Sequence, residues 1–100
     1  MELESAAKAF KELGHPSRLA IFKHLVKAGH QGAPVGELQQ ALEIPNSTLS
    51  HHVSALVASG LVKQHRDGRT LYCIPQFEAL RGLIDFLMNE CCASDQISTN

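Results

Sequence analysis

Apolar residues recur every three to four positions along most of the chain, which is the spacing of one face of an α-helix. This spacing predicts helices over residues 3–13, about 16–28, 35–42, from a cap at Asn46 or Ser47 to Gly60, and about 76–92. Pro45 separates the third helix from the fourth because proline lacks the amide hydrogen that a continuing helix needs. Residues 30–34 are expected to form a loop.

Two strand-like runs, residues 61–66 and 70–74, precede the last helix and are separated by an Asp-Gly pair, which is a strong signal for a hairpin turn. The order helix, helix, helix-turn-helix, hairpin, helix is the layout of a winged helix domain. We therefore expect a mostly α-helical fold with a small β-hairpin, in the order α-α-α-α-β-β-α. This domain is predicted to span residues 1–92 and to be followed by a flexible polar tail over residues 93–100.

The composition fits one domain with one core, since the chain has 100 residues of which 44% are apolar. The longest apolar stretches fall far short of the roughly 20 residues that a membrane span requires. Residues 1–5 are acidic and unlike a secretory signal. We therefore expect a cytoplasmic protein without a membrane partner, and in that setting its three cysteines are expected to be free thiols.

The net charge of −1 is not typical of a protein that binds nucleic acid, because most of that affinity comes from basic side chains on phosphates. The charge is, however, unevenly distributed. Residues 1–43 carry five acidic and five basic side chains, residues 44–75 carry one acidic and three basic, and residues 76–100 carry four acidic and one basic. The middle segment therefore has a local positive charge.

The second helix of a helix-turn-helix enters the major groove of DNA by its first turns, so the residues there decide its function. Leu49 and Val53 are expected to face inward, four residues apart. The polar side chains left for a groove or for solvent are Ser47, Thr48, Ser50, His51 and His52. Hydroxyls and imidazoles can donate and accept hydrogen bonds to base edges and phosphates. The alternative interpretation is that the hydroxyls only cap the helix and the histidines are solvated.

Two arginines flank the predicted hairpin turn, Arg66 before it and Arg69 after it. Both could reach a phosphate or an adjacent minor groove, and the alternative is a solvated hairpin tip. His15, His24 and His30 are predicted to be surface or capping histidines and receive no functional role.

The sequence resembles the arsenical-resistance (ArsR/SmtB) repressors over residues 8–92. The residues that carry this resemblance are Leu-Gly-His-Pro-Ser-Arg-Leu-Ala-Ile at 13–21, Ser-Thr-Leu-Ser-His-His-Val at 47–53, Ser-Gly-Leu-Val at 59–62, and Asp-Gly-Arg at 67–69 with Tyr72. The resemblance implies a homodimer that pairs through its first and last helices. It implies that the dimer binds an inverted repeat in double-stranded DNA, represses transcription and is released by a metal or metalloid. No cofactor is expected for DNA binding itself.

Relatives of this kind sense metals through different ligand sets. The cysteine motif that several of them carry in the third helix is absent, and Asp85 in the last helix lacks the histidine neighbours of a zinc site. What remains is Cys91 and Cys92, a pair of soft thiols that could hold one trivalent arsenic. Arsenite would prefer three sulfurs, whereas an organoarsenical needs only two. Cys73 could supply a third sulfur if the fold brings it near, although a buried structural thiol is the favoured interpretation.

Three rival functions remain open at this point. A repressor of the same fold could use its thiols as a redox or reactive-sulfur switch. A thiol enzyme is disfavoured because the pair is predicted at a helix C-terminus, where the dipole opposes thiolate formation. An interaction module without an effector would bind DNA regardless of any thiol reagent.

Overall fold

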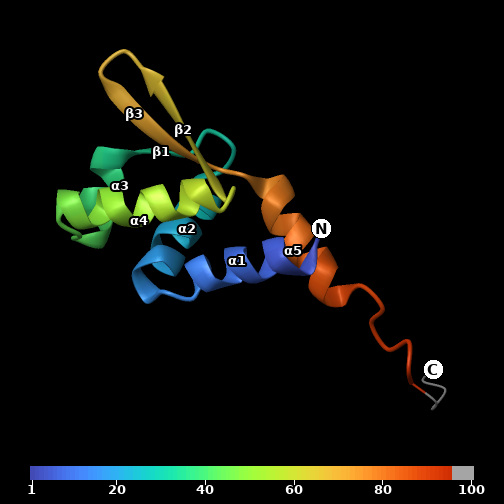
Figure 1. Cartoon of the computed structure of the whole chain (residues 1–100). Helices are drawn as coiled ribbons and strands as arrows, with labels where there is room; N and C mark the ends of the chain where they lie inside the picture. Colours follow the sequence, from blue (N-terminus) through green and yellow to red (C-terminus); the bar gives the residue numbers. More distant parts are fainter. Residues whose placement is uncertain (96–100) are drawn as a thin grey trace.

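The computed structural model describes residues 1–95 and contains five helices and three strands within them. In chain order these are α1 (Leu3–Leu13), α2 (Pro16–Ala28), β1 (Ala33–Pro34), α3 (Val35–Leu42), α4 (Asn46–Ala58), β2 (Val62–Asp67), β3 (Thr70–Pro75) and α5 (Phe77–Met88). The hairpin of β2 and β3 projects from the helices as a wing (Figure 1). The predicted winged helix fold is therefore confirmed. Residues 96–100 of the predicted tail lie outside the described part of the chain.

The loop predicted over residues 30–34 contains a short strand that the sequence did not reveal. β1 pairs antiparallel with β3, with Ala33 opposite Cys73 and Pro34 opposite Tyr72, so the sheet has three strands in the order β1-β3-β2. Two residues are too few to show the alternation that identifies a strand, and one of them is a proline. β1 ties the start of α3 to the base of the wing.

The N-cap of α4 is Pro45, so the prediction that Asn46 or Ser47 caps this helix is wrong. Pro45 has extended backbone angles, its carbonyl accepts the amide of Leu49 over 2.8 Å, and no side chain caps the helix end. The side chains of Asn46 and Ser47 are exposed on the first turn of α4. Their polar groups are therefore available to a ligand.

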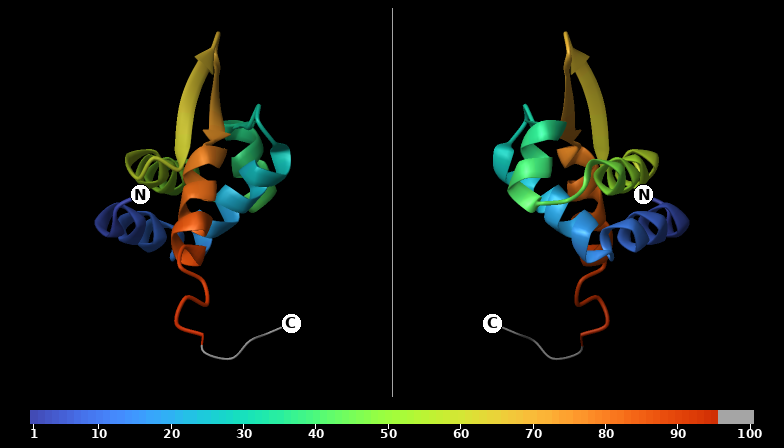
Figure 2. Two further views of the ribbon diagram at one scale, coloured as in Figure 1. Left: turned by 90° about the vertical axis from the view of Figure 1, so that its right-hand side faces the viewer. Right: turned by 90° about the vertical axis from the view of Figure 1, so that its left-hand side faces the viewer.

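The last helix is shorter than predicted, because α5 ends at Met88 and not at residue 92. Asn89 leaves the helical conformation with ψ 134°, and both Glu90 and Cys92 adopt φ 64° in the turns that follow. The helical spacing of Cys91 with the apolar face of α5 misled the sequence prediction. The two cysteines lie on turns beyond the helix, at the opposite end of the molecule from the wing (Figures 1 and 2).

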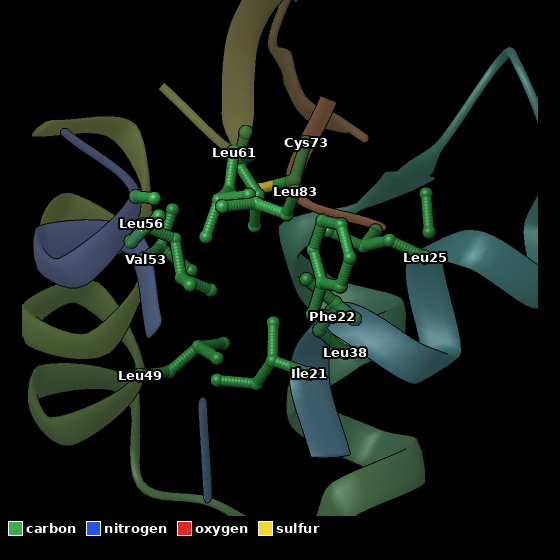
Figure 3. Packing of buried hydrophobic residues seen from close by; sticks show 14 residues of the cluster. Ile21, Phe22, Leu25, Leu38, Leu49, Val53, Leu56, Leu61, Cys73 and Leu83 are labelled. Carbon is green, nitrogen blue, oxygen red and sulfur yellow. The ribbon is translucent and has the colours of Figure 1, made fainter. Parts of the chain in front are cut away.

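One hydrophobic core contains side chains from all five helices and from the sheet, with α2 and α4 contributing three each (Figure 3). Its largest fully buried side chains are Ile21, Leu25, Leu38, Leu49, Leu56, Leu61, Leu83, Val53 and Cys73. Among these, Leu49, Val53 and Leu56 form the inward face of α4, as the spacing predicted for the first two. The core therefore fixes which face of α4 points outward.

The most exposed large apolar side chains of the helices lie on α1 and α5, where this core does not cover them. On α1, Leu3 and Phe10 are exposed although their spacing marks one helix face, and only Ala6 and Ala9 of this helix are buried. On α5, a second exposed set consists of Ile84, Leu87 and Met88, which are 54%, 65% and 58% exposed. No helix within residues 1–95 is long and apolar enough to cross a membrane.

Gly32→Ala is expected to lower the free energy of unfolding by at least about 2 kcal/mol. Gly32 has φ +68°, and a β-carbon there would lie 1.9 Å from the carbonyl oxygen of Cys73, on the strand that pairs with β1. Urea denaturation followed by circular dichroism measures the change.

The matched control is Gly36→Ala in α3, where a β-carbon meets nothing within 4 Å. Its stability is expected to stay the same or to rise by up to about 1 kcal/mol, because alanine favours helix more than glycine does. Equal stability of the two variants would contradict the close approach of residues 32 and 73.

Candidate nucleic-acid interface

The first turns of α4 present a polar face to solvent. Ser47, Thr48, Ser50 and His51 are all exposed, and Leu49 between them is fully buried. These are four of the five side chains that sequence analysis assigned to this face. They supply hydroxyl and imidazole groups that can donate and accept hydrogen bonds.

His52, the fifth predicted side chain, is not available to a groove, and that prediction is wrong. Only 5% of His52 is exposed, and its Nδ1 accepts a hydrogen bond from Nε of Arg18 over 3.1 Å. Residues 49, 52, 53 and 56 follow the helical spacing of a buried face, and this signal could have placed His52 inside. Burial lowers the pKa of His52, and the nearby His15, Arg18 and His51 lower it further.

Arg18 connects His52 to α1, because its Nη1 also forms an ion pair with Oε2 of Glu12 at 2.6 Å. His15 lies beside this cluster, with its ring 4.6 Å from the ring of His52, and caps α2 by accepting the amide of Ser17 over 3.1 Å. The capping role predicted for His15 is confirmed. The role of Arg18 was missed, because sequence spacing gives no information on contacts between separate helices.

A cleft of about 540 Å³ separates α4 from the wing. It is lined by Pro34, Val35, Gly36, Asn46, Ser50, Arg69, Thr70 and Leu71. The fold thus brings the hydroxyl of Ser50 and the guanidinium of Arg69 to one concavity, and adds the polar side chains of Asn46 and Thr70, which sequence analysis did not select. Arg66 is exposed on β2 opposite Leu71 and does not line the cleft.

The thiols of Cys91 and Cys92 lie close together on the exposed turn after α5, with their sulfur atoms 3.0 Å apart. Their hydrogen bond raises the pKa of Cys91, so this thiol stays protonated at neutral pH. The thiol of Cys91 is therefore poorly suited to nucleophilic catalysis, which needs a thiolate. This reason replaces the helix-dipole argument, since neither cysteine lies in the helix.

Cys73 is buried in the core and is not brought to this pair. Its side chain is fully buried, and burial raises the pKa of its thiol. The twelve-residue helix α5 separates β3 from the turn that carries the pair, a rise of about 18 Å. Within residues 1–95, no group of three or more histidine, cysteine or acidic side chains is arranged to hold a metal ion.

Comparison with known proteins places this fold in a functional family. Residues 13–65 match the family model described as a helix-turn-helix domain. The chain is 32% identical over 87 residues to the transcriptional repressor PagR of Bacillus anthracis, covering 87% of this chain and 85% of PagR. The crystal structure of PagR superposes with a TM-score of 0.70 over 85% of this chain and 94% of that one.

Two further structures share the fold. An ArsR-like transcriptional regulator from Rhodococcus sp. RHA1 is 22% identical with a TM-score of 0.79, covering 93% of this chain and 85% of that one. The transcriptional repressor BigR from Xylella fastidiosa is 30% identical with a TM-score of 0.67, covering 86% and 85%. With its motifs, its wing and these relatives, this chain belongs to the ArsR/SmtB family of winged helix-turn-helix transcriptional regulators.

Proposed function

We propose that the protein is a metalloid-responsive repressor that binds an inverted repeat in double-stranded DNA as a homodimer. A trivalent arsenical, either arsenite or an organoarsenical, binds Cys91 and Cys92 and releases the dimer from its operator. The observation that carries the effector assignment is the 3.0 Å separation of two exposed sulfur atoms.

The cleft between α4 and the wing supports the DNA-binding part of the proposal. The first turns of α4 enter the major groove, where Ser47, Thr48 and His51 reach base edges. Ser50 and Arg69 line the cleft beside them and hold the adjacent sugar-phosphate strand. Arg66, exposed on β2, contacts phosphate further along the wing.

The exposed apolar faces of α1 and α5 support the homodimer. Such faces are costly in water and are typical of surfaces that pair with another chain. In a two-fold symmetric dimer, the apolar faces of one subunit pack against the same faces of the other subunit, so both copies are covered. It would also present two copies of α4 to the two halves of an inverted repeat.

The chemistry of the thiol pair suits an arsenical that carries one carbon substituent. In methylarsonous acid, arsenic bears two hydroxyl groups and one methyl group. Each thiol replaces one hydroxyl, so that two As–S bonds form, two As–O bonds break, and the thiol protons leave with the hydroxyls as two water molecules. Arsenic stays trivalent, and no oxidant or reductant is required. Because Cys73 is buried in the core, the proposed site has two sulfurs.

Release of DNA requires a difference in affinity between the free and the arsenical-bound dimer. The thiol pair begins three residues after the end of α5, and the amide of Cys91 donates to the carbonyl of Met88 over 2.8 Å. Met88 and Leu87 are exposed residues of the proposed dimer face. Closing a ring over Cys91 and Cys92 changes the turn that ends this helix, and thereby changes the spacing of the two subunits. A coupling of about 1–3 kcal/mol, a 5- to 150-fold loss of affinity, is enough for regulation.

Arg69→Ala is expected to weaken DNA binding by about fivefold to tenfold. The slope of log affinity against log salt concentration is expected to become shallower by about 2, because each of the two subunits loses one phosphate contact. Fluorescence anisotropy measures both quantities on a labelled duplex that the wild-type protein selects from a random-sequence pool. Lys27→Ala, which removes the same charge from the end of α2, is the control and keeps the wild-type slope. An unchanged slope in Arg69→Ala would remove the wing from the interface.

Leu87→Asp is expected to convert the dimer to a folded monomer, because Leu87 is exposed in the single chain and a carboxylate there cannot be covered by a partner. Sedimentation velocity measures the oligomeric state, and circular dichroism measures the fold. Glu78→Lys is the control: it changes the charge of another exposed residue of α5 and is expected to leave the dimer intact. A dimeric Leu87→Asp protein would contradict the proposed interface.

Methylarsonous acid is expected to release the selected duplex from the wild-type protein with a 5- to 150-fold loss of affinity, and from neither Cys91→Ser nor Cys92→Ser. Anisotropy titrations with methylarsonous acid, arsenite, antimonite, zinc and hydrogen peroxide measure this. Cys73→Ala serves as the matched control and responds as the wild type does.

Unchanged release in both serine variants would reject the thiol pair as the effector site. Release by peroxide alone, with a mass change that shows oxidised thiols, would reject the arsenical and favour the redox switch of the same fold.

A further inference from the structure

One chain of polar side chains joins three helices and takes no direct part in the proposed DNA contacts. Arg18 of α2 donates to His52 of α4 over 3.1 Å and pairs with Glu12 of α1 at 2.6 Å. The side chains of Arg18 and Glu12 are only 16% and 19% exposed, and His52 is buried. Arg18 therefore uses two separate nitrogen atoms to connect α1 and α4.

We propose that Arg18 and His52 are positioning residues for DNA binding, which hold α4 at one rotation about its axis as long as the imidazole of His52 is neutral. This inference rests on the proposed use of α4 as the helix that enters the groove. It adds a set of residues that act on the operator without touching it, and it makes the affinity for DNA depend on pH.

The apolar side chains of α4 bury the helix but do not by themselves fix its rotation finely. Leu49, Val53 and Leu56 gain free energy from burial, which is non-directional. A hydrogen bond, by contrast, weakens steeply when its angle falls below about 120°. The bond from Arg18 to His52 therefore defines the rotation at which the exposed hydroxyls of α4 point into a groove.

The surroundings of His52 oppose a positive charge on its ring. The groups around it are Arg18 from α2, His15 from the turn between α1 and α2 with its ring 4.6 Å away, and His51 from α4 itself with its ring 5.9 Å away. Glu12 is the acidic member of the cluster, and it is bonded to Arg18. Burial and these neighbours together lower the pKa of His52.

Protonation removes the acceptor on which this arrangement depends. In the neutral ring Nδ1 accepts from Arg18, whereas in the charged ring both nitrogens are donors. The pKa of His52 is lower in the folded protein than its ordinary value of about 6.5. The stabilisation is therefore present above about pH 6.5 and is lost as the pH falls through the lower, folded-state pKa.

The test compares four variants with the wild type, using the selected duplex and the full chain. His52→Asn keeps an oxygen acceptor for Arg18 but does not titrate, and His52→Leu keeps the burial but removes the acceptor. Arg18→Lys keeps the charge but cannot bridge two partners with a fixed fork. His24→Asn is the control for loss of a histidine, since His24 pairs with Glu37 at 2.9 Å and lies outside the cluster.

Three results are expected from anisotropy between about pH 7.5 and pH 5.5. His52→Asn binds within about twofold of wild type at the higher pH, whereas His52→Leu and Arg18→Lys bind about tenfold more weakly, a difference of about 1.4 kcal/mol. The ratio of the wild-type Kd to the His52→Asn Kd rises on acidification, because only the wild type loses its acceptor by protonation. Any pH effect that both proteins share cancels in this ratio. His24→Asn follows the wild-type profile.

Hydrogen exchange of α4 in the absence of DNA separates this inference from the proposed function. At the lower pH, and after correction for the intrinsic exchange rate, the amides of α4 are expected to exchange faster in the wild type than in His52→Asn. If His52→Leu is as stable as wild type and binds DNA as tightly, or if His52→Asn shows the wild-type pH profile in both measurements, the inference is overturned. A wild-type protein that selects no duplex would overturn the proposed function, and the exchange data would still decide on the cluster.

Discussion

The inward packing of α4 is the constraint on which the rest of the molecule depends. Leu49, Val53 and Leu56 are buried in the core, where α4 packs against α1, α2 and β2 (Figure 3). Burial of three such side chains contributes roughly 5–9 kcal/mol, which is comparable with the whole net stability of a small domain. Because α4 buries this stripe, the opposite face of the helix is exposed to solvent. The core therefore decides that the face of α4 with the hydroxyls of Ser47 and Ser50 is the outward one.

Much of this arrangement could be predicted because it follows from periodicity. The spacing of apolar residues is a local property of the sequence, and it located all five helices and the two strands of the wing. Prediction from this spacing failed where a structural feature depends on a contact between residues far apart in the sequence. β1 exists because β3 lies beside it, and the partner of His52, Arg18, lies on another helix. The burial of His52 itself could have been predicted from its spacing with Leu49 and Leu56. α5 ends early although Cys91 continues its spacing, because the backbone turns at Asn89.

The local distribution of charge matters more for DNA binding than the net charge of the chain. A chain of net charge −1 can belong to a DNA-binding family because affinity for phosphate depends on the charges beside the duplex and less on the total. Screening limits each charge to a range of about 8–10 Å at ordinary salt. The acidic residues that follow the wing lie on α5 and beyond it, and the thiol turn lies at the opposite end from the wing (Figure 2). Asp85, Glu90 and Asp95 thus lie toward the end opposite the wing, whereas Asp67 lies in the wing itself.

This separation also sets the requirement that any effector mechanism must meet, since an event at the thiol turn has to reach α4 through the body of the protein. Glu12 lies on α1, one of the two helices with exposed apolar faces, and Arg18 connects it to His52 on α4. A change in how two subunits pack through α1 and α5 would move Glu12 and thereby change the bond that holds α4. The Glu12–Arg18–His52 chain connects α1, which carries part of the proposed dimer face, to α4.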